Sequence, residues 1–304
     1  MAENIHDKFF KENFSRHDIA LAFVEEVFPA SLLKKLKLET FALSNASYVD
    51  TTLEEYFADI VYSCRYDDEQ SLEIAILFEH KSYKETYPHF QLLRYLLNSW
   101  EQARKQNQLP TLLIPIIIYH GKARWNYEPL RSYFGVVDDN LSRFVPDFEY
   151  LLFDISRHTD DEILGFRNRF LATSLFLMKH RENEQRLLAQ RDRLFVWLED
   201  ISDLQTGSNY LQATLVYLFR NLDFRTKEFY QQLFSTPRNS QKAMSTYDYL
   251  IEEGRKEGRL EVVVAFLKMA YQQGIDITKF LNQDYGLPKE QVQVVVDKIK
   301  KGQL

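Results

Sequence analysis

The chain has 304 residues, of which 45% are hydrophobic and 14% aromatic, with only nine glycines and eight prolines. This composition excludes a disordered tail, a collagen-like repeat and a linker array, and the length suits about two domains that each bury their own core. The single cysteine, Cys64, excludes an internal disulfide and a zinc site built from several cysteines. Residues 1–155 carry 16 Lys and Arg against 24 Asp and Glu, and residues 156–304 carry 22 against 20. Neither half therefore has the strongly basic character typical of nucleic-acid binders.

No segment has the composition of a targeting signal or of a membrane-spanning helix. The first residues are charged and lack an apolar signal core. The longest apolar run, 112–119, contains a proline and is far shorter than the ~20 residues that span a membrane. We expect a cytoplasmic protein without a membrane partner.

The first third of the chain changes between helical and strand periodicity. Residues 17–28 place their apolar side chains on one helical face, and a proline ends this helix. Two strand-like runs, 57–66 and 72–80, flank the polar segment 67–71, which predicts an antiparallel hairpin. From 87 to about 106 the apolar residues recur every 3.6 positions, so a helix follows the hairpin.

The remaining chain contains two more strands and then only helices. Residues 112–119 are apolar on both faces, as expected for a central strand covered by helices on either side, and 150–155 form a short strand. The segment Ser235–Ser240 is the best candidate for a linker. Helical periodicity extends over 171–179, 187–198, 211–219, 229–234, 247–271, 277–281 and 289–299.

These elements predict the α/β fold class: a mixed central sheet flanked by helices, followed by an all-helical C-terminal half. We divide the chain into a core at 1–155, a helical extension packed on the core at 156–240, and a C-terminal helical segment at 241–304.

Charged residues gather at one end of the predicted hairpin. If the turn centres on Glu69, residues whose numbers sum to 138 lie opposite each other, so Asp59 faces Glu79. Alternation along the strand puts Lys81 on the same side as Glu79, and a slip of one residue would break this arrangement. We therefore expect two carboxylates and one ammonium group close together.

This grouping has a chemical and a plain structural interpretation. Two carboxylates and a main-chain carbonyl are hard oxygen ligands that suit Mg²⁺ or Mn²⁺. Such an ion holds a phosphodiester and lowers the pKa of an attacking water, while a neighbouring lysine orients that water or balances the developing charge. The alternative is a salt bridge between Glu79 and Lys81 at the edge of the strand. The hairpin alone does not decide between them.

A wider set of residues matches a known family. In the helix after the hairpin, Gln91 and Tyr95 share a face at positions i and i+4. Together with Asp59, Glu79-His80-Lys81 and Leu113-Ile-Pro-Ile-Ile-Ile-Tyr-His-Gly121, they resemble the Rpn family of recombination-promoting nucleases, within the PD-(D/E)xK nuclease superfamily. The resemblance covers about residues 5–200 and extends to the spaced Glu-Gly pairs of Glu253–Glu261.

The resemblance implies a PD-(D/E)xK core that acts as a divalent-metal-dependent DNA endonuclease, a phosphodiester hydrolase associated with recombination or mobile elements in bacteria. By position, Asp59 and Glu79 match the acids that bind Mg²⁺, or Mn²⁺ or Ca²⁺ in its place. The main-chain carbonyl of His80 would be a further metal ligand, and Lys81 matches the catalytic lysine. Gln91 matches an auxiliary polar residue near the metal or the water.

Two positions depart from or extend the family pattern. Ala58 stands where the superfamily name has proline, at a loosely held position. An acid on the preceding segment, either Glu54 or Glu55, is a candidate for an additional contact to the metal site, and the sequence does not choose between them.

Two other classes of function stay open. A non-catalytic interaction protein would keep the nuclease-like fold and use its helical half to dock partners, but the complete set of Asp59, Glu79 and Lys81 argues against it. A transposase with three acids on a ribonuclease-H-like fold would need a third carboxylate on a later helix and would leave Lys81 without a role.

The C-terminal helices carry apolar residues that are too few to form a core alone, such as Val262, Val263, Phe266, Leu267 and Ala270. We expect these helices to pack against the rest of the chain or against a second copy, and we favour a homodimer.

Overall fold

The chain forms two units in the computed structural model, Met1–Phe224 and Arg225–Leu304, and each is described by itself. The structure describes residues 5–44, 60–67, 72–201, 204–221, 226–281, 283 and 285–303, with the backbone alone at 72–79 and 221. The first unit thus combines the expected sheet with most of the helices that follow it in sequence.

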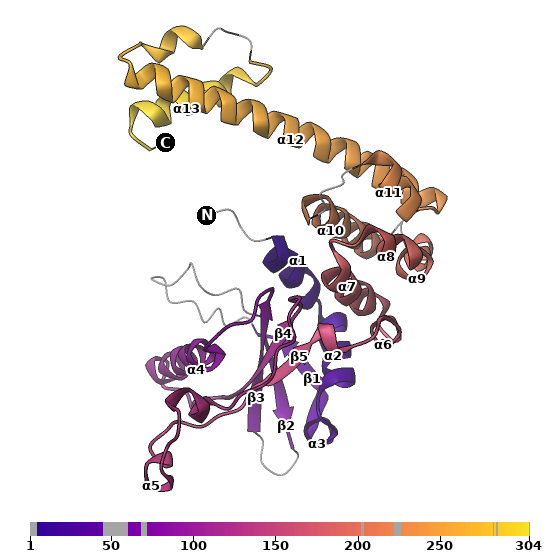
Figure 1. Ribbon diagram of the computed structural model, residues 1–304, viewed down its shortest axis with the longest axis vertical. Coiled ribbons are helices and arrows are strands. Elements are labelled where there is room, and N and C mark those ends of the chain that lie inside the picture. The colour runs from indigo at the N-terminus through magenta and orange to yellow at the C-terminus, as the bar shows by residue number, and fades with distance from the viewer. Residues whose placement is uncertain are drawn as a thin grey trace. The chain divides into compact units, whose positions relative to one another are not determined.

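A five-stranded mixed sheet lies at the centre of the first unit, with its strands side by side in chain order (Figure 1). β1, β2 and β3 pair antiparallel, whereas β4 pairs parallel with both β3 and β5. The mixed sheet and the antiparallel hairpin expected from the sequence are therefore confirmed. The strands are β1 (Leu36–Leu43), β2 (Ile60–Tyr66), β3 (Leu72–Lys81), β4 (Leu112–Tyr119) and β5 (Leu151–Asp154).

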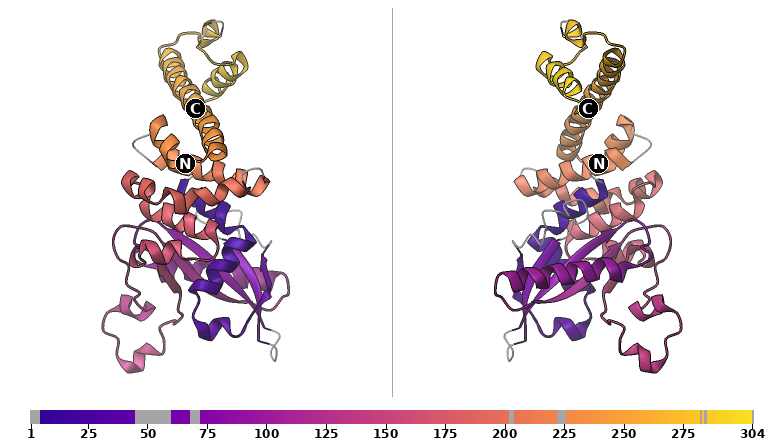
Figure 2. Two further views of the ribbon diagram at one scale, coloured as in Figure 1. Left: turned by 90° about the vertical axis from the view of Figure 1, so that its right-hand side faces the viewer. Right: turned by 90° about the vertical axis from the view of Figure 1, so that its left-hand side faces the viewer.

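Helices cover both faces of this sheet (Figure 2). On one face, α4 (Pro88–Lys105) forms the expected helix but buries Leu92, Tyr95 and Leu96, whereas Phe90 and Leu97 of the expected apolar pattern are exposed. On the other face lie α1 (Ile5–Phe14) and α2 (His17–Val27): the Tyr62 hydroxyl of β2 donates to the Phe14 carbonyl at 2.9 Å, and the rings of Phe23 and Phe153 are 5.2 Å apart. The cluster under α4 comprises Val61, Leu92, Tyr95, Leu96, Leu113, Ile117, Tyr119, Trp125 and Tyr150.

β1 and α1 are the longest elements of the first unit that have no counterpart in the sequence expectations. In β1 the pairing with β2 shifts register between Lys37 and Ala42, so the strand lacks a continuous alternation of apolar and polar residues. The ten-residue helix α1 packs through Phe9, Phe10 and Phe14, and its charged residues obscured this apolar face in the sequence.

The helices after β5 pack around α1. The hydroxyl of Ser174 in α7 donates to the Asn13 side chain at 2.9 Å, and the Tyr217 ring of α10 stacks on Phe9 at 4.1 Å. The expected single helix at 187–198 is instead divided among several short pieces. These helices are α6 (Asp160–Leu164), α7 (Arg169–His180), α8 (Glu184–Ala189), α9 (Arg191–Phe195), η3 (Val196–Ile201) and α10 (Gln205–Asn221); short elements elsewhere are α3 (Ala30–Leu33), η1 (Leu130–Phe134), α5 (Asp139–Ser142) and η2 (Ile155–Arg157).

The second unit consists of α11 (Lys227–Leu233), α12 (Pro237–Gln272), η4 (Ile277–Phe280) and α13 (Lys289–Lys300). The expected linker at Ser235–Ser240 is wrong, because α12 begins inside it, and Pro237 is tolerated in the first helical turn. Val263, Leu267 and Ala270 of the expected stripe pack in a core with α13, whereas Val262 is exposed. Within the described ranges, no helix is both long and apolar enough to cross a membrane.

Candidate functional site

The carboxyl end of β3 is the expected site, and its backbone has the expected register. Ile60 pairs with Phe78 and Tyr66 with Leu72, so each described pair of β2 and β3 sums to 138. On the other side, Glu79 pairs with Ile117 of β4. Asp59, Glu54 and Glu55 lie outside the described residues, and Glu79 is described by its backbone alone. The hairpin register that the Asp59–Glu79 pairing requires is therefore present along the described strands.

Lys81 is the last residue of β3 and is buried, with 8% of its surface exposed. Its backbone pairs with Tyr119 of β4, whose side chain lies in the cluster under α4. Since paired residues of neighbouring strands direct their side chains to the same face, Lys81 lies on the α4 face. An ammonium group at such a depth requires a carboxylate or other polar partner nearby. A Glu79 carboxylate would meet this requirement both in a metal site and in a salt bridge with Lys81, so the burial does not choose between the two interpretations.

α4 places two further expected residues on the same face. The side-chain amide of Gln91 donates to the Tyr95 hydroxyl at 3.3 Å, one helical turn away. Tyr95 is buried against Ile117 and Tyr119 of β4. The fold thus brings Lys81 and the Gln91–Tyr95 pair to one side of the sheet.

The side chain of His80 lies on the opposite face, under α1. Its Nδ1 is 3.2 Å from the Asp7 carboxylate, and its ring is 5.0 Å from the Phe10 ring. It also stacks on the His120 ring at 4.4 Å. Because these contacts occupy the His80 side chain, only its main-chain carbonyl is available for the role expected from the sequence.

A group of histidines on this face was missed by sequence reasoning. His6 of α1 lies 5.2 Å from His120 and 6.5 Å from His80 between ring centroids. Arg181, just after α7, brings its guanidinium to within 2.9 Å of His120 Nδ1. The only signal in the sequence was the Tyr-His-Gly segment, since the other members are far apart along the chain. We call His6, His80, His120 and Arg181 the histidine cluster.

Burial and neighbouring charges lower the pKa of two imidazoles of the histidine cluster, those of His6 and His120. Burial, together with the neighbouring Arg181 and His80, lowers the pKa of His6 to about 4. Burial, followed by His80 and Arg181, moves the pKa of His120 far below its ordinary value. Because protonation is disfavoured, the cluster is a packed and hydrogen-bonded part of the core and is a poor candidate for a general acid near neutral pH.

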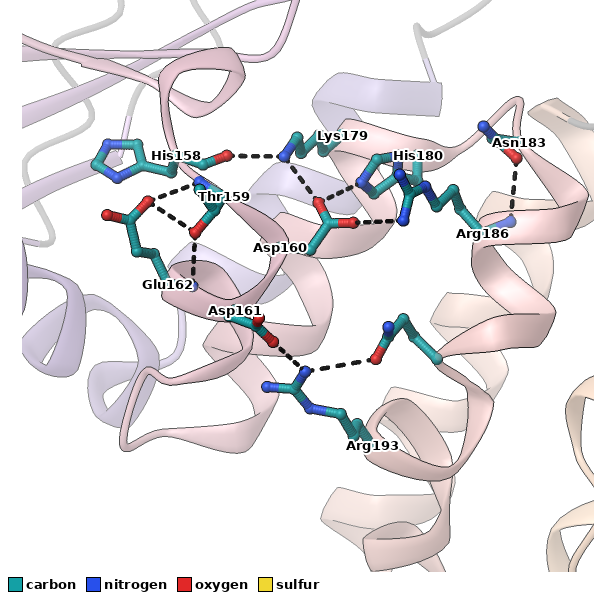
Figure 3. Close-up of polar contacts among 11 residues, drawn as sticks. His158, Thr159, Asp160, Asp161, Glu162, Lys179, His180, Asn183, Arg186 and Arg193 are labelled. Carbon is teal, nitrogen blue, oxygen red and sulfur yellow. Dashed lines mark hydrogen bonds and ion pairs between the residues drawn. The ribbon is translucent and has the colours of Figure 1, made fainter.

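A cavity of about 660 Å³ opens beside this cluster, at the carboxyl ends of β4 and β5. Lys179, His180 and Arg181 contribute cationic or titratable groups to its wall, and each of them already has a partner. The Asp160 carboxylate accepts from Lys179 at 2.8 Å and His180 at 2.7 Å, and Arg186 lies 3.8 Å away (Figure 3). Burial opposes ionisation, but these hydrogen bonds hold the pKa of Asp160 below its ordinary value. We interpret this network as a structural contact that holds α6 against the end of α7.

The residues at the end of β3 have the right chemistry for a divalent cation. Carboxylates from Asp59 and Glu79 with the carbonyl of His80 would form an all-oxygen donor set, which hard ions such as Mg²⁺ prefer. Among the side chains that the structure describes, no three His, Cys, Asp or Glu residues are placed to hold a metal ion, the histidine cluster included. The expected site at the end of β3 is therefore the candidate to test.

Comparisons with known proteins agree on one family. The family model described as "Putative transposase, YhgA-like" matches residues 4–208. The chain is 27% identical to the inactive recombination-promoting nuclease-like protein RpnE of Escherichia coli K12, over 89% of this chain and 91% of RpnE. It is 27% identical to the recombination-promoting nuclease RpnD of E. coli O157:H7 (79% and 91% covered) and 24% identical to RpnA of E. coli K12 (94% and 95% covered). No solved structure matches the chain significantly.

Proposed function

Since the chain belongs to the Rpn family of YhgA-like transposases, we propose that it is a nuclease that acts in DNA recombination, and more specifically a divalent-metal-dependent DNA endonuclease with a PD-(D/E)xK core. The observation that carries this proposal is the buried Lys81 at the end of β3, a strand whose described pairs with β2 all follow the register that the Asp59–Glu79 pairing requires. The names of RpnD and RpnA support the nuclease assignment.

In the proposed mechanism each residue of the site has a separate task. Asp59 and Glu79 would hold the cation, Mg²⁺ or Mn²⁺, together with the main-chain carbonyl of His80. When bound, the cation lowers the pKa of water and stabilises negative charge on the phosphate. The Lys81 ammonium donates a hydrogen bond to the attacking water or to a phosphate oxygen, where charge develops in the transition state. Gln91 orients the water through its side-chain amide.

A plasmid assay tests this proposal. The purified chain is incubated with supercoiled plasmid in Mg²⁺, Mn²⁺, Ca²⁺ or EDTA, and nicked and linear products are measured. We expect cleavage in Mg²⁺ or Mn²⁺ and none in EDTA. Asp59→Asn and Glu79→Gln, which keep side-chain size, should abolish cleavage in variants that circular dichroism shows to be folded. Parent-level cleavage by both variants would disprove the site assignment.

A non-catalytic role is the alternative function. It is supported by the similarity to RpnE, which is named an inactive nuclease-like protein. The present chain retains Asp59, Glu79 and Lys81. The same plasmid assay separates the two functions, because an inactive chain would cut no DNA in any of the four conditions.

We also propose that the second unit joins two chains in a homodimer. Val262 and Met269 of α12 are exposed and lie seven residues apart, on one side of the helix. Replacing both with lysine should halve the mass measured by light scattering. Glu257→Lys, on the same helix, is the control for the change in charge. An unchanged mass in the double variant would contradict this interface.

A further inference from the structure

Exposed aromatic rings follow the proposed site closely along the chain. Tyr83, Tyr87 and Phe90 follow β3 within nine residues of Lys81, and their exposed fractions are 60%, 49% and 42%. Lys81 Nζ is 5.8 Å from the centroid of the Tyr83 ring, within the range of a cation–π contact. The Tyr87 and Phe90 rings stack with centroids 5.5 Å apart. Single exposed apolar residues are ordinary, but a group of exposed rings that follows the proposed site in sequence requires an explanation.

Aromatic and polar contacts order the Tyr87 and Phe90 rings. Tyr133 of η1 supports the pair edge-on, at 5.1 Å from Tyr87 and 5.5 Å from Phe90. The Tyr133 hydroxyl is fixed by His89 Nδ1 at 2.8 Å. Before α4, the Glu85 carboxylate accepts from the backbone amide of Tyr87 at 3.4 Å. Rings that are already ordered lose little conformational entropy when a flat ligand stacks on them.

The charges around the rings favour the binding of nucleobases over the binding of a long phosphate backbone. Lys84 and Arg94 are exposed and lie within one helical turn of the rings in sequence, but Glu85 and Glu128 line the adjoining cavity of about 290 Å³. A strongly basic groove, which tracking a duplex would require, is therefore absent from this described part of the surface. Stacking of a nucleobase on an aromatic ring needs no such groove.

We propose that Tyr87 and Phe90, backed by Tyr133, form a stacking platform for unpaired bases of a DNA strand whose phosphate enters the site at Lys81. This inference rests on the proposed nuclease function and adds its substrate class: single-stranded DNA, or duplex with a locally unpaired segment. Tyr83 lies between the platform and the lysine in sequence, and its ring covers the side of the Lys81 ammonium.

Fluorescence anisotropy with the full chain tests the platform without requiring cleavage. A labelled oligonucleotide is titrated in EDTA, both single-stranded and as the duplex of the same sequence. Tyr87→Ala and Phe90→Ala should each weaken binding of the single strand about tenfold, as expected for the loss of one stacked base, and change duplex binding less than twofold. Tyr87→Phe should bind like the parent because the ring remains. Phe144→Ala removes an exposed aromatic ring elsewhere and should have no effect.

The possible outcomes separate the platform from the proposed function. Unchanged single-strand binding in both alanine variants would overturn the platform, and so would an equal loss for single strand and duplex. A change in solution mass in these variants would assign the rings to contact between protein chains and would also overturn it. Parent cleavage of plasmid in Mg²⁺ would leave the nuclease proposal standing in each of these cases. A parent that neither binds nor cuts DNA would overturn both proposals.

Discussion

At the end of β3, the neighbouring residues His80 and Lys81 direct their side chains to opposite faces of the sheet, where they meet two different environments. On the α4 face, Lys81 lies buried near the Gln91–Tyr95 pair. On the α1 face, the side chain of His80 stacks on His120, and the pKa values of His120 and His6 are lowered. The first face would act through a charge, whereas on the second face burial disfavours the charged forms of His6 and His120. The difference shows that a histidine beside a catalytic lysine need not share its chemistry.

The largest expected effect is on the α4 face. Lys81→Met keeps the volume of the side chain but removes its charge, and we expect the cleavage rate to fall by about 10²–10³, the usual cost of losing one donor to transition-state charge. The thermal midpoint should stay close to that of the parent. Lys84→Met, three residues away and exposed, is the matched control. A Lys81→Met chain that cuts plasmid at the parent rate would remove the lysine from the mechanism.

On the α1 face we expect a loss of stability. His120→Ala deletes a buried ring that stacks on His80 and accepts from Arg181, and it should lower the free energy of unfolding by about 2–4 kcal/mol. Urea denaturation measures this change. Lys122→Ala, an exposed neighbour, should leave the midpoint within experimental error. Under conditions in which it is folded, the His120→Ala chain should keep most of its cleavage rate. A loss comparable to that of Lys81→Met would show that the α1 face also contributes to catalysis.

Acid should weaken the α1 face. The pKa of His6 is about 4 in the folded chain against an ordinary 6.5, so the unfolded chain binds more protons between these values and stability falls as the pH drops from about 6.5 to 4. Arg181 and His80 reinforce this direction, while Asp7 and Glu182 oppose it. The urea midpoint should therefore decline over this range and decline less in His6→Phe. His158→Phe, outside the cluster, serves as the control. Equal declines in parent and His6→Phe would rule out His6 as the cause.

The smallest effect is expected for the Gln91–Tyr95 pair on the α4 face. Gln91→Ala should lower the cleavage rate only about tenfold, because the amide orients the water without carrying charge. Tyr95→Phe removes the hydroxyl that accepts from Gln91 and should have a similar or weaker effect. Rates under single-turnover conditions distinguish these variants from Lys81→Met. A loss as large as that of Lys81→Met would show that Gln91 is essential for cleavage.

The elements around the α4 face were predictable because each one has a regular local pattern. The hairpin register followed from a polar turn between two strand-like runs, and the 3.6-residue spacing in 87–106 gave the helix over the sheet. Strand β4 lies where the apolar run predicted it, at Leu112–Tyr119. The assignment of Asp59 and Glu79 to a metal remains a prediction.

The α1 face was not predictable in the same way. Its histidine cluster joins His6, His80, His120 and Arg181 from four separate elements, and only their tertiary packing brings them together. A single sequence contains no periodic signal for such a group. The start of α12 was misplaced for a local reason, since Pro237 suggested a break but in fact occupies the first turn of the helix.

The register shift that concealed β1 has a consequence for association between chains. β1 is the first strand of the sheet, and an edge strand with regular hydrogen-bonding groups can recruit a strand from another molecule. The irregularity between Lys37 and Ala42 interrupts that row of groups, and the opposite edge, β5, is only four residues long. Both margins of the sheet are therefore poor templates for intermolecular strand addition, which protects the folded chain from edge-to-edge aggregation.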